Sequence, residues 1–353
     1  IPIFALLVCL LCALTKHALA QNPGTEEFVA RPLFNASETL VLTLNLPWEG
    51  IERDEFFFQG VYPASLQYHD QGGKRVSFDV GVQRRGASRQ VVCRMPPLKL
   101  RFEKETVKGT VFEGQKSLKL VTHCSKDRPF EQYYIREMLA YRIYNLITDL
   151  SFRVRPVSIR YVDSESGHTE GPRFAFLVED DSDVAKRNGQ KALKVGNITA
   201  QQLDAEESTR MALFQYIIGN ADWDAISGPE PDECCDNTKL VGRDPLQDPI
   251  YAIPNDFDSS GLVSAHYASP PAGLPIEAVS ERLFLGYCVH NASLDGAIEH
   301  LLGREEEVYA LVNAETLLHA EARQETLRYL ERSYEILKAP RDFKKEASAS
   351  CRQ

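Results

Sequence analysis

Six Asp and Asn side chains fall close together in the segment 216–261, after an apolar run and after a short β-like run. They are Asn220, Asp222, Asp224, Asn237, Asp256 and Asp258. Carboxylates that are crowded together repel one another and are costly to desolvate, so such a cluster is either a set of solvated turns or a site completed by a cation. Phosphoryl transfer uses these residue types: a carboxylate accepts the hydroxyl proton, Asp and Asn oxygens hold Mg²⁺, and a Lys neutralises phosphate charge.

The order of the cluster along the chain matches that chemistry. Asp222 follows a predicted helix, Asn237 comes next, and Asp256 follows the β-like run "PIYAIP". A kinase-type catalytic lobe uses a helix-to-loop Asp, an Asn and a strand-end Asp in this order, with about five residues from the first to the second. Here Asn237 comes 15 residues after Asp222, and we expect Cys234 or Cys235 to staple the intervening insert. The competing interpretation is ordinary Asp and Asn turns.

A cation for the phosphates is available on two predicted strands. A kinase pairs its phosphate-binding Lys with a Glu on the following helix. Lys119 and Lys99 are both candidates, and Glu137 lies 18 residues after Lys119 on a predicted helix. We favour Lys119 paired with Glu137, with Lys99 and Glu131 as the respective alternatives.

A turn and a strand complete the expected nucleotide pocket. Arg85-Gly86-Ala87-Ser88 falls where a loop would cover the phosphates, and its backbone N–H groups or the Ser88 hydroxyl would contact them. The run "FLVED" at 176–180 falls where a hinge strand would contact the adenine.

The secondary structure expected from the sequence changes near Asn197, from mainly strands to mainly helices. Residues 38–121 alternate apolar and polar positions and are broken by Gly, Pro and Asp, which predicts strands. Residues 130–147 form a helix that is apolar on both sides, and such a helix is sandwiched between layers. We therefore expect an α+β chain with a signal peptide at 1–20, a β-rich first lobe at 21–196 and a helical second lobe at 197–353.

Two motifs carry a family resemblance. "IGNADW" and "IPNDFDSSG", with "VQRRGAS" and "PPLKLRF" before them, resemble the CotH-type spore-coat kinases and, more distantly, the secreted Golgi casein kinases. The resemblance is patchy and spans roughly residues 40–261. It implies a two-lobed, atypical protein-kinase-like fold in which Asp222 is the catalytic Asp and Asp256 the metal Asp. Asp258 would be a second or substitute metal ligand and Asn237 the metal Asn.

The beginning of the chain predicts export. Its apolar run, residues 1–14, is shorter than the roughly 20 residues of a membrane span, and it ends in Ala-Leu-Ala before Gln21, as at a signal-peptidase site. No later apolar run is long enough to span a bilayer, so we expect a periplasmic or extracellular protein without stable membrane insertion.

Cysteine content and charge limit the other functions. An exported chain with an even number of cysteines is expected to form disulfides, and six cysteines allow fifteen pairings. The six that follow the signal peptide are Cys93, Cys124, Cys234, Cys235, Cys288 and Cys351. A net charge of −10 disfavours nucleic acid and anionic membranes as partners.

These observations favour an exported kinase that transfers phosphate from ATP, with Mg²⁺ or Mn²⁺, to a Ser, Thr or other hydroxyl on a secreted or envelope protein. The same site would serve a nucleotidyl transferase if ATP bound in the flipped orientation. The alternative from a different class is a non-catalytic envelope binding protein on a pseudokinase-like scaffold. The stretched spacing to Asn237 and the plain Arg85–Ser88 loop favour that alternative.

Overall fold

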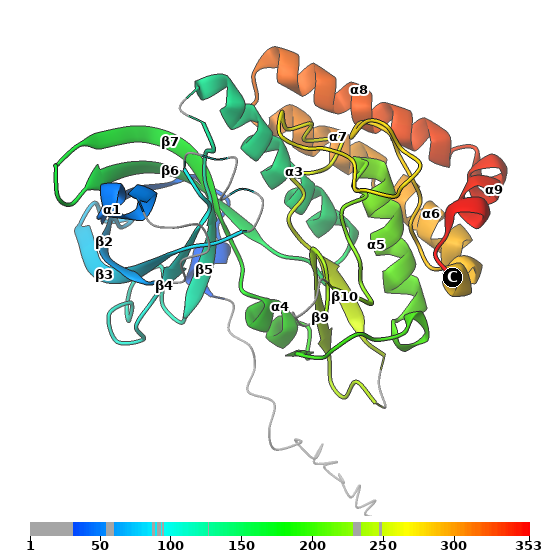
Figure 1. Ribbon diagram of the computed structural model, residues 1–353, viewed down its shortest axis with the longest axis horizontal. Helices are drawn as coiled ribbons and strands as arrows, with labels where there is room; N and C mark the ends of the chain where they lie inside the picture. Colours follow the sequence, from blue (N-terminus) through cyan, green and yellow to red (C-terminus); the bar gives the residue numbers. More distant parts are fainter. Residues whose placement is uncertain are drawn as a thin grey trace, which may run out of the picture.

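The computed structural model describes residues 31–53, 60–86, 89, 93, 95–125, 127–228, 234–246 and 249–353. A closed seven-stranded β-barrel, a small three-stranded sheet and a set of helices make up these parts of the chain. The barrel lies on one side of the molecule and most of the helices on the other (Figure 1). The expectation of a mixed α and β chain, β-rich first and helical later, is confirmed. The predicted signal peptide lies outside the described residues.

The barrel follows the order β1-β2-β3-β4-β5-β7-β6, and a parallel pairing of β6 with β1 closes it. Its alternating sequences explain its interior: on β4, Leu98 and Leu100 are buried, whereas Lys99 and Arg101 point outward. Closure was not anticipated from the sequence. The strands are β1 (Leu40–Leu46), β2 (Tyr62–His69), β3 (Arg75–Arg84), β4 (Leu98–Arg101), β5 (Ser117–Val121), β6 (Val154–Asp163) and β7 (Thr169–Val178).

Helix α3 (Glu131–Ile147) joins the barrel to the helical region. In Figure 1 it runs between the two, and it packs against β6 and β7 on one side and against α5 and α7 on the other. Tyr134, Tyr144 and Met138 are fully or almost fully buried. The prediction of a sandwiched helix is confirmed.

The later part of the chain is helical apart from a small sheet of order β10-β9-β8. Strand β8 (Lys191–Ala192) pairs with β9, so the sheet draws in residues just before the expected boundary at residue 196. A helix before Asp222 was predicted, and α5 ends at Gly219, its C-cap residue. The remaining elements are α1 (Trp48–Arg53), α4 (Asp181–Arg187), α5 (Ala205–Ile218), β9 (Thr238–Gly242), β10 (Tyr251–Pro254), α6 (Leu294–Leu302), α7 (Glu305–Ala314), α8 (Ala320–Leu337) and α9 (Pro340–Ser350), with short 3₁₀ turns at Pro32–Phe34, Arg128–Phe130, Ala200–Gln202 and Cys288–Ser293.

Three disulfides are present among the described residues, which confirms the expectation that disulfides form. They join Cys93 to Cys124, Cys234 to Cys235, and Cys288 to Cys351. The expected staple of the insert takes a different form, because its two cysteines bond to each other rather than to another segment.

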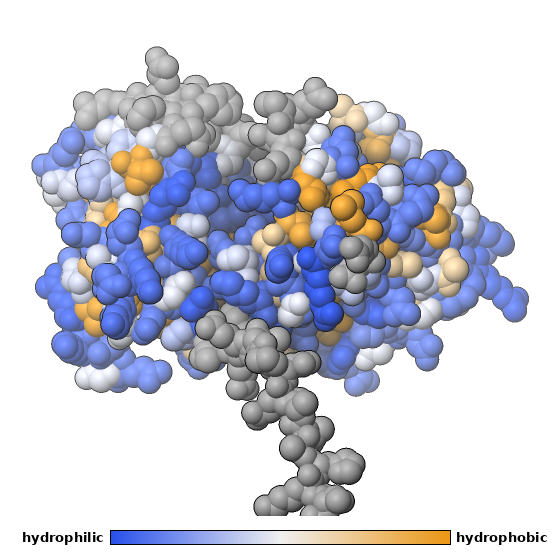
Figure 2. Space-filling model, turned by 90° about the horizontal axis from the view of Figure 1, so that it is seen from below, coloured by the Kyte–Doolittle hydropathy of each residue, from blue (hydrophilic) through white to orange (hydrophobic). Residues whose placement is uncertain are grey.

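One face of the outer surface can be followed in Figure 2. The face in Figure 2 is mostly hydrophilic, and its hydrophobic side chains gather in a few patches. Within the described parts of the chain, no helix has both the length and the apolar character needed to cross a membrane.

Candidate functional site

The end of α5 turns the chain sharply into the loop that carries Asp222. Gly219 has a φ of 63°, and a Cβ there would lie 1.9 Å from the Tyr329 hydroxyl, so no other residue fits without rearrangement. The Asn220 side chain then accepts a hydrogen bond from the Asp222 N–H and donates one to Gln215. Gly219 and Asn220 therefore shape the loop that carries Asp222.

Backbone hydrogen bonds fasten this loop to the segment after β10. The Gly261 N–H donates to the Gly219 carbonyl at 3.0 Å, and the Leu262 N–H donates to the Ile218 carbonyl at 2.9 Å. The two motifs that carry the family resemblance are thus adjacent in space.

Asn237 lies beside both motifs despite its long sequence spacing. Its side-chain Nδ2 donates to the Asp222 carbonyl at 2.8 Å, and its own carbonyl accepts from the Asn255 N–H at 2.9 Å. The next residue, Asp256, has a φ of 63°, and its N–H donates to the hydroxyl of Tyr141 on α3. Asn237 therefore lies beside Asp222 although 15 residues separate the two along the chain.

Asp222 and Asp224 differ in role although they are two residues apart. The Asp224 carboxylate accepts hydrogen bonds from the N–H groups of Ile226 and Ser227 at 2.8 and 3.1 Å. It is the turn-forming residue that the competing interpretation expected.

Asp222 instead faces other acids. Burial and then the nearby carboxylates of Asp236, Asp258 and Asp256 raise the pKa of Asp222 to about 6, and a hydrogen bond with Ser259 opposes the rise. A carboxyl with a pKa near 6 is largely ionised at neutral pH, yet it accepts a proton more readily than an ordinary Asp.

Arg89 occupies the centre of the site, and the sequence interpretation missed it. Its Nη2 donates to Glu137 Oε2 and to Asp256 Oδ1, both at 3.1 Å. Its Nε donates to Asp258 Oδ2 at 2.7 Å. Arg89 is 5% exposed and Glu137 fully buried. The only available signal was a third arginine immediately after the expected phosphate loop.

The pKa shifts in this cluster follow from burial and from its opposed charges. Burial acts to lower the pKa of Arg89, but the Asp258 and Glu137 carboxylates raise it well above its usual value. Burial raises the pKa of Glu137 to about 8, against the opposing charge of Arg89. Burial also acts to raise the pKa of Asp256, but the charges of Arg89 and Arg85 bring it below its ordinary value.

Lys119 projects from β5 toward the same segment. Its Nζ donates to Asn255 Oδ1 at 2.8 Å. Burial and the charge of Arg85 lower the pKa of Lys119 to about 7, and the Asp256 carboxylate opposes this. Asn255 was not among the residues singled out from the sequence.

The predicted pairing of Lys119 with Glu137 is wrong. Arg89 pairs with Glu137 because a guanidinium can bond two carboxylates at once, whereas the single ammonium of Lys119 is directed to the amide of Asn255. The alternative acid, Glu131, pairs with Arg173 and lies outside the cluster.

Lys99 lies directly opposite Lys119 on the neighbouring strand. Burial and the charge of Arg101 lower the pKa of Lys99, and Asp180 opposes this. The two acids of the expected hinge have structural partners: Asp180 caps α4, and Glu179 pairs with an arginine of that helix.

The expected phosphate loop is described only in part. Arg85 Nη2 lies 3.6 Å from Asp256 Oδ2, so this arginine faces the site. Gly86 follows with a φ of 77°, a conformation that favours glycine. Ala87 and Ser88 lie outside the described residues.

The described arrangement does not fit a bound metal. The Asp256 and Asp258 carboxylates both accept hydrogen bonds from Arg89. Within the described ranges, no group of three or more His, Cys, Asp or Glu side chains is arranged to hold a metal ion. Asp256 and Asp258, the expected ligands of Mg²⁺ or Mn²⁺, lie close together, but the cation that they contact is the guanidinium of Arg89.

A distant segment braces the Asp222 loop. The Arg352 guanidinium lies 4.6 Å from the centre of the Trp223 ring, and its Nη2 donates to the Trp223 carbonyl at 2.8 Å. Its Nη1 lies 3.7 Å from the Asp224 carboxylate. The preceding residue, Cys351, is held by its disulfide to Cys288.

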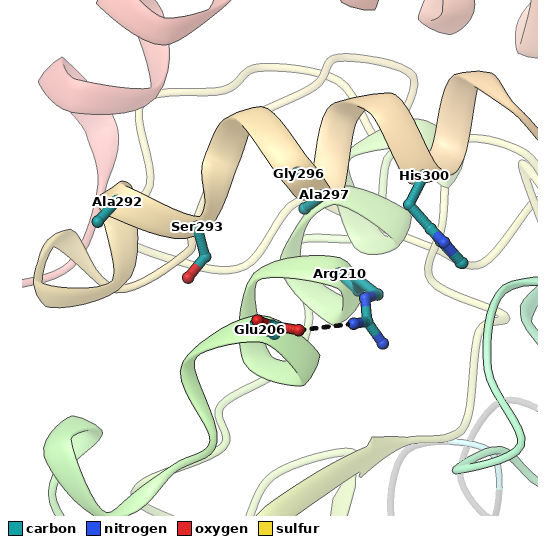
Figure 3. A pocket seen from close by; sticks show the side chains of 7 residues that line it. All are labelled: Glu206, Arg210, Ala292, Ser293, Gly296, Ala297 and His300. Carbon is teal, nitrogen blue, oxygen red and sulfur yellow. Dashed lines mark hydrogen bonds and ion pairs between the residues drawn. The ribbon is translucent and has the colours of Figure 1, made fainter.

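A separate pocket of about 330 Å³ lies between α5 and the start of α6. Figure 3 shows the ion pair of Glu206 with Arg210 on one wall and His300 beside it. The lining residues are Glu206, Arg210, Ala292, Ser293, Gly296, Ala297 and His300. None of the residues predicted from the sequence lies in its wall.

The chain matches no protein-family model and no curated protein. The CotH-type resemblance therefore rests on the quoted motifs alone.

Proposed function

We propose that the protein is an exported phosphotransferase of the CotH type. It would transfer phosphate from ATP to a hydroxyl on a secreted or envelope protein. The observation that carries the proposal is convergence: the barrel supplies Lys119, and the later part of the chain supplies Asp222, Asn237 and Asp256 to the same place. Three disulfides support a compartment outside the cytoplasm.

Asp222 is the proposed proton acceptor. It lies on a loop fixed by Gly219 and Asn220, and burial together with neighbouring carboxylates raises its pKa to about 6. Such a carboxylate can orient the attacking hydroxyl and accept its proton as the new bond to phosphorus forms.

Lys119 and Arg85 are the proposed phosphate ligands. Both carry cationic groups that act on Asp256. Because Arg89 holds Asp256 and Asp258, phosphate charge in this arrangement is met by these two cations.

A matched pair of lysine variants tests the proposal. Lys119→Met should remove most ATP affinity, measured by calorimetry, because a charge beside the Asp256 segment is lost. Lys99→Met, on the opposed strand position, should weaken binding far less. Equal loss in both variants, or no ATP binding by the wild-type protein, would contradict the proposal.

The label that is transferred separates two reactions. A kinase transfers the γ-phosphate of ATP to a protein acceptor, whereas a nucleotidyl transferase transfers the α-labelled nucleotide. Incubation of the purified protein with each labelled ATP, followed by electrophoresis, distinguishes them.

One observation favours a second candidate, a non-catalytic envelope binding protein. Arg89 fills the space among Glu137, Asp256 and Asp258, as a residue of a pseudokinase-like scaffold would. A protein that binds its partner but transfers neither label would support this candidate.

A further inference from the structure

The buried cation at the centre of the site is part of the chain itself. Arg89 contacts Asp256 and Asp258, the two acids that the family resemblance assigns to metal, and also Glu137 of α3. The three contact distances lie between 2.7 and 3.1 Å, and the Arg89 side chain is 6% exposed. This cluster is a buried network of ion pairs and not a surface ion pair.

We propose that Arg89 is a resident cation that competes with a divalent metal ion for Asp256 and Asp258. The inference rests on the proposed function for the assignment of the two acids as metal ligands.

Competition follows from the oxygens that are used. Arg89 engages Asp256 through Oδ1 and Asp258 through Oδ2, while Arg85 approaches the remaining Asp256 oxygen. A hard divalent ion would need oxygens of the same carboxylates, and its charge would lie beside a buried guanidinium. Two cations at this distance repel each other strongly in a site of low polarity.

Arg89 and the acids Asp256 and Asp258 that it contacts come from different parts of the chain. Arg89 lies in the connection between β3 and β4, whereas Asp256 and Asp258 follow β10. The Arg89 carbonyl accepts from the Cys93 N–H at 3.0 Å, and Cys93 is bonded to Cys124. The guanidinium therefore reaches across from a segment with its own anchor.

Titration with MnCl₂ alone, followed by electron paramagnetic resonance and calorimetry, tests the inference. Arg89→Gln should bind Mn²⁺ at least about tenfold more tightly than the wild-type protein, because the competing charge is gone. Arg89→Lys keeps a charge but cannot bridge all three acids, and should fall between the two. Equal or weaker Mn²⁺ binding by Arg89→Gln would overturn the inference and make Arg89 a positioning residue for the acids.

Two further variants locate the effect. Adding Asp258→Asn to Arg89→Gln should abolish the gain in Mn²⁺ affinity, and a gain that persists would overturn the assignment. Arg85→Gln is the matched control: it removes a cation that, among the described acids, pairs with Asp256 and not with Asp258, and should increase affinity much less.

The folded state of Arg89→Gln provides a second measurement. If this variant unfolds without metal, MnCl₂ should restore its thermal transition while leaving that of the wild-type protein unchanged. A variant that stays unfolded at every MnCl₂ concentration would overturn the inference.

The outcome is independent of phosphate transfer. Tight Mn²⁺ binding by Arg89→Gln in a protein that binds no ATP would leave the inference standing and remove the proposed function. Transfer by the wild-type protein with no gain in Mn²⁺ affinity would do the reverse.

Discussion

Two aspartates of this chain, Asp163 and Asp222, have opposite surroundings. Asp163 Oδ1 accepts from the N–H groups of Glu165 and Ser166, and its Oδ2 accepts from that of Glu49, at 2.8 to 2.9 Å. These bonds, that from Ser166 foremost, lower the pKa of Asp163 to about 2. Burial and neighbouring acids raise the pKa of Asp222 to about 6.

The difference separates an acid that builds a turn from one that is available for chemistry. Folding stabilises the charge of Asp163, because backbone N–H groups donate hydrogen bonds to its carboxylate. Asp222 is held by a shaped loop among other acids, so folding stabilises its charge poorly. Strained arrangements of this kind are typical of functional sites.

The largest effect should come from Asp222→Asn. Transfer of phosphate from ATP should fall about 10²- to 10⁴-fold, the usual contribution of a general base, while ATP affinity stays close to that of the wild-type protein. The melting temperature should stay level or rise, because a repelled charge is removed. Rates with labelled ATP, calorimetry and thermal melts measure the three quantities, and a marked loss of stability would place Asp222 with Asp163.

Asp163→Ala should show the opposite pattern. Three backbone N–H groups lose their acceptor, so the free energy of unfolding should fall by ~2–3 kcal/mol, with ATP binding unchanged. Because the pKa is lowered in the folded protein, this stabilisation is present above about pH 4 and is lost as pH falls through about 2. Denaturant unfolding at pH 7 and pH 3 should show a smaller difference between variant and wild type at the lower pH.

Asp224→Ala tests the comparison inside a single loop. Two N–H groups lose their acceptor, so stability should fall by ~1–2 kcal/mol, whereas ATP affinity should not change. Denaturant unfolding beside Asp222→Asn measures this. Identical behaviour of the two variants would show that the loop does not distinguish its two acids.

The smallest effect should come from Arg352→Ala. Loss of the contact with the Trp223 ring should lower stability by ~1 kcal/mol, the usual size of a cation–π interaction. Turnover should fall less than tenfold, because Arg352 acts on Asp222 only through the loop. Arg352→Lys should recover part of the stability, and no recovery would indicate that the hydrogen bond to the Trp223 carbonyl dominates.

Local sequence patterns were enough to predict several of the strands and helices. Alternation predicted β4, and apolar residues on both sides of a helical stretch predicted the sandwiched helix α3. Barrel closure was not accessible, because the parallel pairing of Leu40 with Val157 joins residues far apart in sequence and leaves no local signal.

Site residues that lie within a sequence motif could be predicted, whereas contacts between segments far apart in the chain could not. The chain pattern selected Asp222 and Asp256, and in the structure burial and nearby carboxylates, among them that of Asp256, raise the pKa of Asp222. The partner of Glu137 was misassigned, because a spacing rule selected Lys119 and nothing in the sequence shows that Arg89 reaches across the site. Asn255 was missed because an Asn beside Asp256 is indistinguishable from a turn residue.

The brace on the Asp222 loop has a consequence for the order of events during synthesis. Arg352 is 129 residues beyond the Trp223 carbonyl that it binds, and Cys288 must likewise wait for Cys351. At ordinary rates of translation that separation is on the order of ten seconds. The loop that holds Asp222 therefore emerges well before its last partner, Arg352. A nascent chain would gain the braced loop only after the later helices had been made, and Cys351 could bond to Cys288 only then.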